Sequence, residues 1–194
     1  MKMYNSALKG IMSNIKEKPC EYHKEDRCTL LTWDIWKGDL PKDYDECDVF
    51  YTEAPFPHGF GHFNEKAGIE DDREYVQMGY LIYDKIIATG KPPFLISGKT
   101  LINKMPLCEY RQIKIDGRNC TVWVSFWNGA QSNAESTYEL TSQLAQQYNC
   151  MGDFMCGYGQ NVIDFVQNGG DKFVASDVDS RAVGVLRRRV SHLF

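Results

Sequence analysis

The spacing of apolar residues changes repeatedly along the chain, and each change marks a passage between a predicted strand and a predicted helix. Short β-favouring runs, bounded by glycine, proline or acidic residues, predict strands. These runs occupy residues 28–36, 47–56, 93–98, 151–154 and 172–178. The second strand should stop near Glu53, because Pro55 and Pro57 follow it. Stretches with helical spacing lie at 70–88, 136–148, 160–170 and 180–190.

Strands that alternate with helices favour a mostly parallel α/β sheet with helices on both faces, as in Rossmann-like folds. Residues 110–127 form two alternating runs around Asp116-Gly117, which predict a β-hairpin that supplies an antiparallel edge strand. Residues 57–68 hold three glycines, two histidines and no period, so they predict a mobile loop. The length of 194 residues fits one domain.

Composition narrows the functional classes only slightly. A net charge of −4 gives no global basic footprint, so any contact with DNA must come from local patches. The seven cysteines form no CxxC pair and show no zinc-finger spacing, so we expect reduced thiols and no metal site. The N-terminal segment lacks a signal-peptide core and no stretch has the length of a membrane span, so we expect a cytoplasmic protein without a membrane partner.

A tight glycine turn follows the strand predicted at 151–154. The sequence DFMCGYGQ places Gly157 and Gly159 between this strand and the next helix, where backbone amides approach a ligand closely. Asp177 ends the next strand, about twenty residues downstream, and an acid at that place accepts hydrogen bonds from both hydroxyls of a ribose. The alternative is an ordinary strand-to-helix turn with a solvent-facing aspartate.

Residues 136–190 resemble the C-terminal part of the circularly permuted, S-adenosylmethionine-dependent DNA amino-methyltransferases. That family has a D-P-F-x-G-S-G-T loop, a helix, an F-I-G-I-E-x-D strand and a last helix that ends in A-R-R-R. Here DFMCGYGQ, KFVASDVD and VLRRRV fill those places. LLTWDIW is similar to the family's G-D segment and DVFYTEAPF takes the place of its catalytic motif, so the resemblance covers roughly residues 28–190. It implies the class I methyltransferase fold.

The resemblance also implies a site for S-adenosylmethionine. The residues that would wrap its methionine part are Asp153, Met155, Cys156, Gly157 and Gly159. Asp177 would hold the ribose, and Asp34 would lie near the adenine or the ribose. Ser136 and Thr137 occupy the segment that touches the same cofactor in the family. The alternatives are an ordinary loop acid at Asp34 and simple helix caps at Ser136 and Thr137.

The family's catalytic motif, D/N/S-P-P-Y/F, corresponds here to Glu53-Ala54-Pro55-Phe56. In the family the first residue and a backbone carbonyl hydrogen-bond the target amine, and the terminal aromatic ring stacks on the extruded base. The catalytic residues implied are therefore Glu53, Pro55 and Phe56. Glu53 is one methylene longer than aspartate and Ala54 replaces a proline, so the motif departs from the family. The alternative is a strand end followed by turn-forming prolines.

Residues that could hold a DNA substrate lie around this motif. His58 follows it directly, and Arg111, Lys114 and Arg118 lie on the hairpin, where basic side chains could pair with phosphates. The phenylalanines of 57–68 have the interleaving of a base-stacking loop or of a lid over the cofactor. Little room is left for a target-recognition region, so a homodimer or a protein partner would supply it. A solvated loop histidine and a solvated charged hairpin are the alternatives.

The whole chain then forms a single methyltransferase-like domain, 1–194. Its parts are an N-terminal extension at 1–27, a catalytic-motif half at 28–100, a hairpin region at 101–135 and a cofactor-binding half at 136–194. We expect methyl transfer to an exocyclic amine of a DNA base, adenine before cytosine, without a metal. Two alternatives stay open: a cofactor-binding protein that acts as a regulatory or protective partner, and an enzyme that uses the cofactor on RNA, protein or a small molecule.

Overall fold

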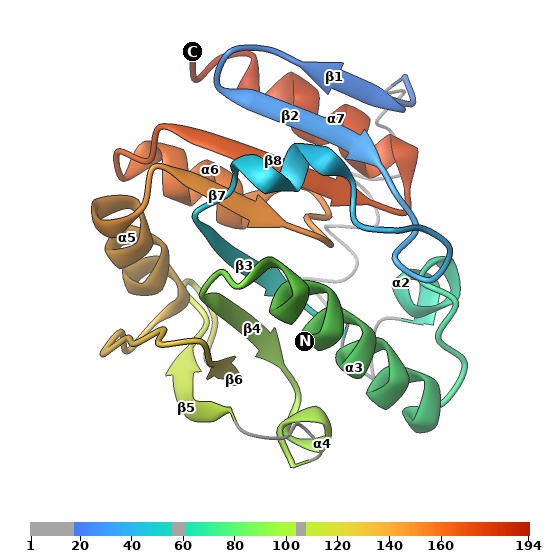
Figure 1. Ribbon diagram of the computed structural model, residues 1–194, viewed down its shortest axis with the longest axis vertical. Helices are drawn as coiled ribbons and strands as arrows, with labels where there is room; N and C mark the ends of the chain where they lie inside the picture. The colour runs from blue at the N-terminus through green and yellow to red at the C-terminus, as the bar shows by residue number, and fades with distance from the viewer. Residues whose placement is uncertain (1–17, 56–60, 104–107) are drawn as a thin grey trace.

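The computed structural model describes residues 18–55, 61–103 and 108–194, with the side chains of 61–63 and 72 left out. The strands are β1 (Tyr22–Lys24), β2 (Cys28–Thr32), β3 (Val49–Glu53), β4 (Pro93–Ser97), β5 (Glu109–Lys114), β6 (Thr121–Phe126), β7 (Cys150–Asp153) and β8 (Lys172–Asp177). They form one eight-stranded sheet in the order β1-β2-β8-β7-β3-β4-β6-β5, which runs from top to bottom in Figure 1.

The five central strands β2, β8, β7, β3 and β4 are parallel. The hairpin of β5 and β6 continues the sheet, because β6 pairs antiparallel with β4 and β5 with β6. These pairings confirm the predicted α/β sheet with an antiparallel hairpin. Strand β1 adds a second antiparallel edge beside β2, inside the predicted extension 1–27. It went unpredicted because three residues are too few to show a period.

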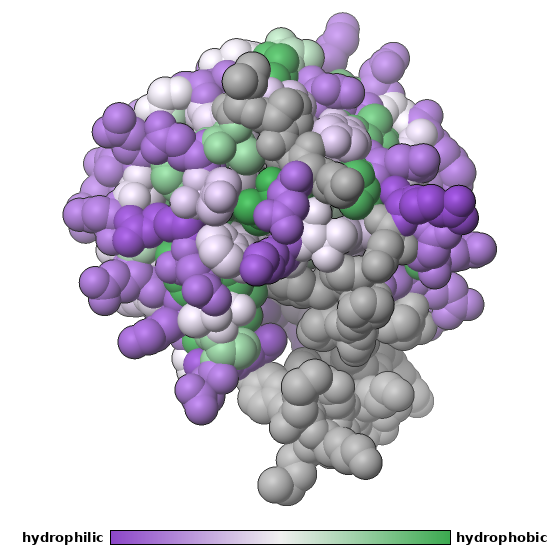
Figure 2. All heavy atoms as spheres, turned by 90° about the horizontal axis from the view of Figure 1, so that it is seen from below, coloured by the Kyte–Doolittle hydropathy of each residue, from purple (hydrophilic) through white to green (hydrophobic). Residues whose placement is uncertain are grey.

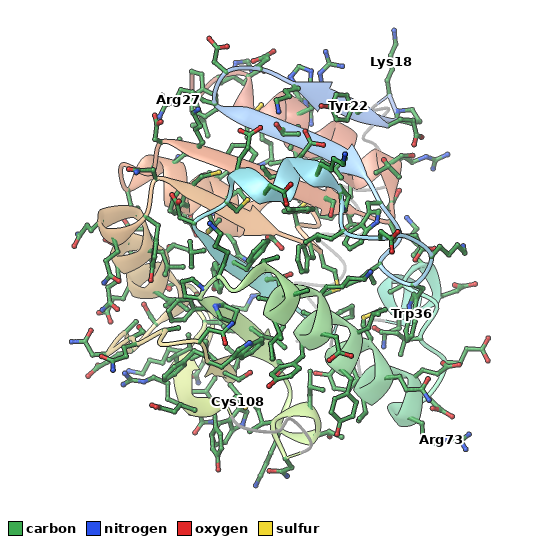
Figure 3. The ribbon with its side chains drawn as sticks, in the orientation of Figure 1. Lys18, Tyr22, Arg27, Trp36, Arg73 and Cys108 are labelled. Carbon is green, nitrogen blue, oxygen red and sulfur yellow. The ribbon has the colours of Figure 1, made fainter. Side chains whose placement is uncertain are left out.

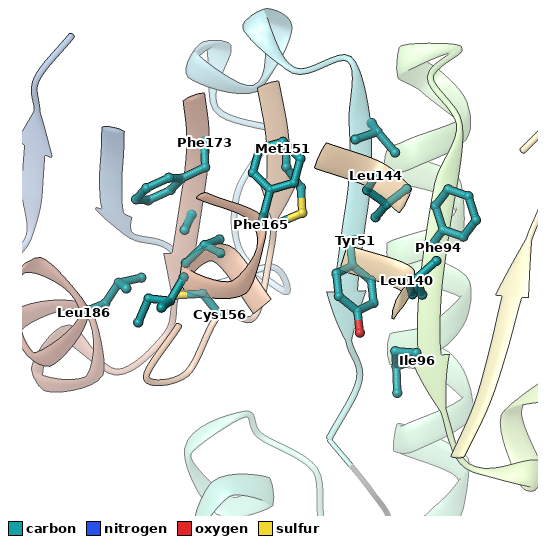
Figure 4. Close-up of a cluster of buried hydrophobic side chains, with 14 of the residues drawn as sticks. Tyr51, Phe94, Ile96, Leu140, Leu144, Met151, Cys156, Phe165, Phe173 and Leu186 are labelled. Carbon is teal, nitrogen blue, oxygen red and sulfur yellow. The ribbon is translucent and has the colours of Figure 1, made fainter. Parts of the chain in front are cut away.

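Helices cover both faces of the sheet. They are η1 (Lys42–Glu46, a 3-10 helix), α2 (Gly61–Lys66), α3 (Asp72–Thr89), α4 (Lys99–Ile102), α5 (Thr137–Gln147), α6 (Gln160–Gln167) and α7 (Ser180–Val190). On one face α5, α6 and α7 bury Leu144, Phe165 and Leu186 against strand residues such as Tyr51 (Figure 4). This apolar contact holds the three C-terminal helices to the sheet.

The opposite face has its own core. There η1 and α3 bury Tyr44, Tyr75 and Ile82 around Phe50 of β3. The neighbour of Phe50 in the chain, Tyr51, points to the other face, as the two-residue period of a strand requires. Strand β3 is therefore buried on both sides, as expected for a central parallel strand.

Helix boundaries follow the predicted cap residues. Asp71 and Glu74 form a capping box at the start of α3, and Gly90 ends this helix in the left-handed conformation at φ 68°. Ser136 caps α5, because its hydroxyl accepts from the Glu139 N–H at 3.2 Å. The predicted helices at 70–88 and 136–148 are confirmed.

The loop predicted at 57–68 is wrong in its second half, where Gly61–Lys66 form the short helix α2. Residues 56–60 lie outside the described residues. Contacts with distant segments anchor α2: Lys66 pairs with Asp179, and the Trp36 indole N–H donates to the Ala67 carbonyl at 2.6 Å. Such contacts leave no periodic signal in the sequence, which explains the error.

Figure 2 shows a mostly polar face among the residues that the structure describes. Hydrophilic side chains cover much of the face in Figure 2, with apolar atoms scattered between them. The helices that the structure describes include none with the length and apolar character of a membrane span. The seven cysteines, all within the described residues, form no disulfide.

Candidate functional site

The chain changes direction across the sheet between two neighbouring strands, β7 and β3. From β7 it continues through α6 to β8 on one side, and from β3 through α3 to β4 on the other. Open α/β sheets bind ligands at such a switch point, outside the carboxyl ends of the strands. Asp153 ends β7, Glu53 ends β3 and Asp177 ends β8, so all three predicted acids lie along this edge.

Asp153 is buried at the carboxyl end of β7, which pairs with β3. Its Oδ1 accepts from the Met155 N–H at 3.1 Å, whereas its Oδ2 has no hydrogen-bond partner among the described residues. Burial raises the pKa of this carboxyl to about 7. The Met155 N–H and the nearby Thr52 hydroxyl oppose the rise in pKa, and the charges of Glu53 and Asp177 add to it. A buried oxygen without a partner costs free energy, so this atom calls for a polar ligand.

The two glycines of the turn serve different purposes. Both have positive φ, 51° at Gly157 and 78° at Gly159. A Cβ on Gly159 would lie 2.1 Å from a side-chain atom of Leu186, so this glycine allows α7 to pack against the turn. A Cβ on Gly157 would meet nothing within 4 Å, so only Gly157 leaves open space beside the turn. Gly159 thus has a packing role of its own, and its place beside a ligand stays a prediction.

Asp177 and Arg189 hold the turn in place. The Asp177 carboxylate accepts from the N–H groups of Gly157 and Asp179, at 2.9 Å each. Burial raises the pKa of Asp177, while these two N–H groups act against the shift. From α7, Arg189 donates to the Tyr158 carbonyl at 2.6 Å and to Gln160 Oε1 at 2.9 Å. Arg189, in the last turn of α7, thus fixes the glycine turn.

The turn holds two sulfur-containing residues, Met155 and Cys156. Cys156 is buried, and its N–H donates to the Ser176 carbonyl at 2.9 Å. Burial raises the pKa of the Cys156 thiol well above its usual range, so the side chain is neutral. Met155 packs against the second core beside Phe154. Helix α6 follows with Gly159 as its N-cap and no side-chain cap, which leaves backbone donors for a ligand.

Glu53 is half-buried at the carboxyl end of β3. Burial raises the pKa of its carboxyl, and the positive charge of Arg118 in the hairpin turn lowers it. Next to Glu53, Thr52 has a buried hydroxyl without a hydrogen-bond partner in the described part of the chain, and so has Tyr51. Ala54 is buried and Pro55 half-buried, whereas Phe56 lies outside the described residues.

Asp34 and the two hydroxyl residues before α5 already have protein partners. Asp34 pairs with Lys37 at 2.8 Å and borders an open hollow of about 470 Å³ that Trp36 also lines. Ser136 caps α5, as described above. The Thr137 hydroxyl donates to the Asp116 carboxylate at 3.0 Å, which joins the hairpin turn to α5. The capping alternative thus accounts for Ser136, and a role of these residues in cofactor binding stays a prediction.

Three of the four predicted substrate residues lie among the described residues, all on the hairpin of β5 and β6. Arg118 acts on Glu53, as its effect on the pKa shows. Arg111 instead donates to the Ser132 carbonyl at 2.7 Å and so fixes the segment that leads to α5. Lys114 is exposed at the end of β5. His58 lies outside the described residues, as does the side chain of His62.

Sequence reasoning missed the polar residues that end the buried strands. Ser97 closes β4 with a buried hydroxyl that has no partner among the described residues. Ser176, near the end of β8, is hydrogen-bonded to the Tyr44 hydroxyl at 2.7 Å. The signal was present, because a serine or threonine in the last two positions of an otherwise apolar strand marks the carboxyl edge.

Among the solved proteins that are similar in structure to this chain are M1.HpyAVI and TTHA0409. M1.HpyAVI in its SAM complex gives a TM-score of 0.56 at 8% sequence identity, over 84% of this chain and 98% of that chain. The "Putative DNA Modification Methylase" TTHA0409 of Thermus thermophilus gives 0.55 at 9% identity, over 84% of this chain and 94% of that chain. The chain shares their fold. No protein-family model and no curated protein matches the sequence.

At identities this low the likeness extends to the fold alone. The predicted methyltransferase-type fold is confirmed, and the chemistry must be argued from the site itself. The groups available there are an unpartnered carboxyl oxygen, an uncapped helix start and the half-buried Glu53.

Proposed function

We propose that the protein binds S-adenosylmethionine at the crevice between β7 and β3 and transfers its methyl group to an exocyclic amine of a DNA base, adenine in the first place. The observation that carries the proposal is the buried Asp153 Oδ2 without a partner in the described part of the chain, next to the glycine turn. M1.HpyAVI and TTHA0409, which share the fold, have both been solved with this cofactor.

The residues at the crevice fit the cofactor. Asp153 Oδ2 is an acceptor for the ammonium of the methionine part, and the uncapped start of α6 offers N–H donors to its carboxylate. Met155, Cys156 and Gly157 would line the same part. Asp177 would accept from the ribose, because each of its oxygens has a second lone pair free. When bound, the cofactor supplies an electrophilic methyl group on a sulfonium.

Glu53 would accept a hydrogen bond from the target amine and so direct the nitrogen lone pair toward the methyl group. Catalysis would then come from positioning, with Pro55 keeping the backbone rigid and Phe56 stacking on the base. The positive charge of Arg118 favours the ionised form of Glu53, which is the form that accepts. DNA phosphates would bind Arg118, Lys114 and His58. Arg111 is less suited, because Ser132 already occupies it.

The order of the two halves supports a permuted family. The catalytic strand β3 precedes the glycine turn and β8 in the chain, which is the order of the circularly permuted DNA amino-methyltransferases that the sequence resembles. We therefore keep the division into 28–100, 101–135 and 136–194 as part of the proposal. A second copy or a protein partner would complete target recognition.

The alternative is a protein that binds the cofactor and no longer methylates DNA. The sequence Glu53-Ala54 favours it, because a displacement of about 1 Å of the accepting oxygen can cost on the order of a hundredfold in rate. Such a protein would act as a regulatory or protective partner. An enzyme that uses the same cofactor on RNA, protein or a small molecule is the third candidate.

Transfer of a radiolabelled methyl group to DNA, RNA or protein tests the proposal. We expect label in DNA, and a loss of about 2.7–4 kcal/mol of transition-state stabilisation in Glu53→Ala. Phe56→Ala should weaken DNA binding by about 1–3 kcal/mol through lost stacking.

The double variant Glu53→Asp/Ala54→Pro rebuilds the family's motif and separates the candidates. Label in DNA from this variant but not from the wild type would establish the degenerate protein. Cofactor binding without any labelled nucleic acid from either protein would overturn DNA methylation.

A further inference from the structure

A second cluster of chemically active side chains lies at the top of the sheet in Figure 1, far along the sheet order from β3 and β7. His23, Glu25 and Cys28 each offer one ligand atom, and these atoms all lie within 4.8 Å of one another. His23 Nε2 and Glu25 Oε1 are 3.0 Å apart. The three residues belong to β1, to the turn after it and to β2.

The hairpin register explains why these side chains meet. His23 stands opposite Leu30 in the antiparallel pair, so it shares a face with Leu30 and with Cys28, two positions away on β2. Leu30 and Cys28 belong to the core under α7. Glu25 in the turn reaches His23 on the same side.

Arg187 on α7 places one positive charge near Cys28, whereas two other neighbouring cations, Lys24 and Arg27, are engaged elsewhere. Lys24, on the opposite face of β1, pairs with Asp43 at 3.3 Å and with Glu46 at 2.6 Å. Arg27 pairs with Asp171 at 3.3 Å and lies over the Phe194 ring. Figure 3 shows Arg27 at the turn end of the hairpin. Neither positive charge is therefore free to replace a bound cation.

We propose that His23, Glu25 and Cys28 form a binding site for a divalent cation of the zinc class. A nitrogen, an oxygen and a sulfur ligand together suit Zn²⁺ better than Mg²⁺ or Ca²⁺, which prefer oxygen ligands alone. Tetrahedral bonds of about 2.0–2.3 Å bring ligand atoms to roughly 3.5 Å from one another. His23 and Glu25 are already 3.0 Å apart, so the closure that remains from at most 4.8 Å lies in the distances to Cys28.

Coordination changes the protons of the cluster. The Cys28 thiol must lose its proton to bind a cation, because the thiolate is the form that ligates a metal. On binding, the S–H bond breaks, the sulfur binds the cation and the proton leaves to solvent. Three protein ligands leave a fourth position for water.

The site would hold the edge strand β1 to β2, because its ligands come from both strands. No metal was expected, because the cysteines form no CxxC pair and show no zinc-finger spacing. The hairpin brings His23, Glu25 and Cys28 together instead. The inference does not depend on methyl transfer, so the failure of either proposal leaves the other intact.

Titration of the metal-free protein with Co²⁺ tests the site, because a cobalt–thiolate bond absorbs in the near ultraviolet. We expect one Co²⁺ per chain with this absorption, and Zn²⁺ should displace it. Glu25→Gln, a change at an exposed position, should weaken Co²⁺ binding by about tenfold or more and keep the absorption. Cys28→Ser should abolish the absorption.

The matched control is Cys120→Ser, which removes an exposed cysteine on the hairpin of β5 and β6 and should leave the titration unchanged. Loss of the absorption in Cys28→Ser supports the site only if the circular dichroism of the variant matches that of the wild type. If Cys28→Ser does not fold, the Co²⁺ affinities of Glu25→Gln and His23→Ala test the site in its place. A wild type without thiolate absorption at saturating Co²⁺ would overturn the proposal. So would absorption that survives in folded Cys28→Ser, or that vanishes in Cys120→Ser.

Discussion

The two strands that border the crevice end in different ways. After β7 the chain is tied down, because Asp177 holds the N–H of Gly157 and Arg189 holds the carbonyl of Tyr158. At the end of β3, by contrast, the buried hydroxyls of Tyr51 and Thr52 have no partner among the described residues. These hydrogen bonds fix the turn without a ligand. The end of β3, in contrast, carries buried polar atoms that have no partner among the described residues. We interpret the first as a cofactor platform and the second as the substrate side.

The largest effect should separate the two glycines of the turn. Gly159→Ala adds strain at φ 78° and a clash with Leu186, so it should destabilise the fold by about 2–5 kcal/mol. Gly157→Ala meets only the backbone strain and should cost about 1–2 kcal/mol. Urea denaturation of both variants measures the difference. Equal losses would contradict the packing role of Gly159.

The next effect concerns Asp153 and pH. Since the folded-state pKa of about 7 is raised above the unfolded value, the folded protein loses stability as pH rises from about 4 to 7. Asp153→Asn removes this loss, so the variant should gain on the order of 2–4 kcal/mol above pH 7 and nothing near pH 4. Denaturation across this range measures the gain. A variant less stable than the wild type at pH 8 would show that the carboxylate has a partner.

Loss of the Arg189 contacts should loosen the turn. Arg189→Ala removes two hydrogen bonds and should cost about 1–2 kcal/mol, since the guanidinium is partly exposed. Cofactor affinity should fall with it, because the turn is no longer fixed. Arg181→Ala, at the start of the same helix, is the control and should change neither quantity. Calorimetry measures the cofactor affinity of the two variants, and denaturation measures their stability.

The smallest effects compare two buried hydroxyls of the central strands. Ser176→Ala breaks the hydrogen bond with Tyr44 and should destabilise the protein by about 1–2 kcal/mol. Tyr51→Phe removes a buried hydroxyl without a partner in the described part of the chain, so it should be neutral or stabilise by about 1 kcal/mol. A clear destabilisation by Tyr51→Phe, measured by urea denaturation, would contradict the view that β3 carries an unused polar atom.

Much of the fold was readable from the sequence because its elements carry local signals. The apolar run of β3 stops at Glu53 before prolines, α3 begins at an acidic cap and Gly90 ends it. The missed elements have no such signal. Helix α2 depends on the contact of Lys66 with Asp179, which is distant in the chain.

The site was predictable to a similar extent. Asp153, Asp177 and Glu53 follow from the rule that parallel strands present their carboxyl ends at one edge. The different surroundings of Gly157 and Gly159 could not be predicted from the sequence, because they depend on the position of Leu186. The same holds for Thr137, whose partner Asp116 lies in the hairpin turn.

The central claim is that Asp153 receives the ammonium of S-adenosylmethionine, and isothermal titration of this cofactor tests it most directly. The wild type should bind one molecule per chain at pH 8, and Asp153→Asn should bind about 10- to 150-fold more weakly, as expected for one lost charge-assisted hydrogen bond. Below pH 7 the wild-type affinity should fall by about tenfold per pH unit, because the carboxyl with a pKa of about 7 takes up a proton. Absent binding, or equal affinities of the two proteins at pH 8, would contradict the account.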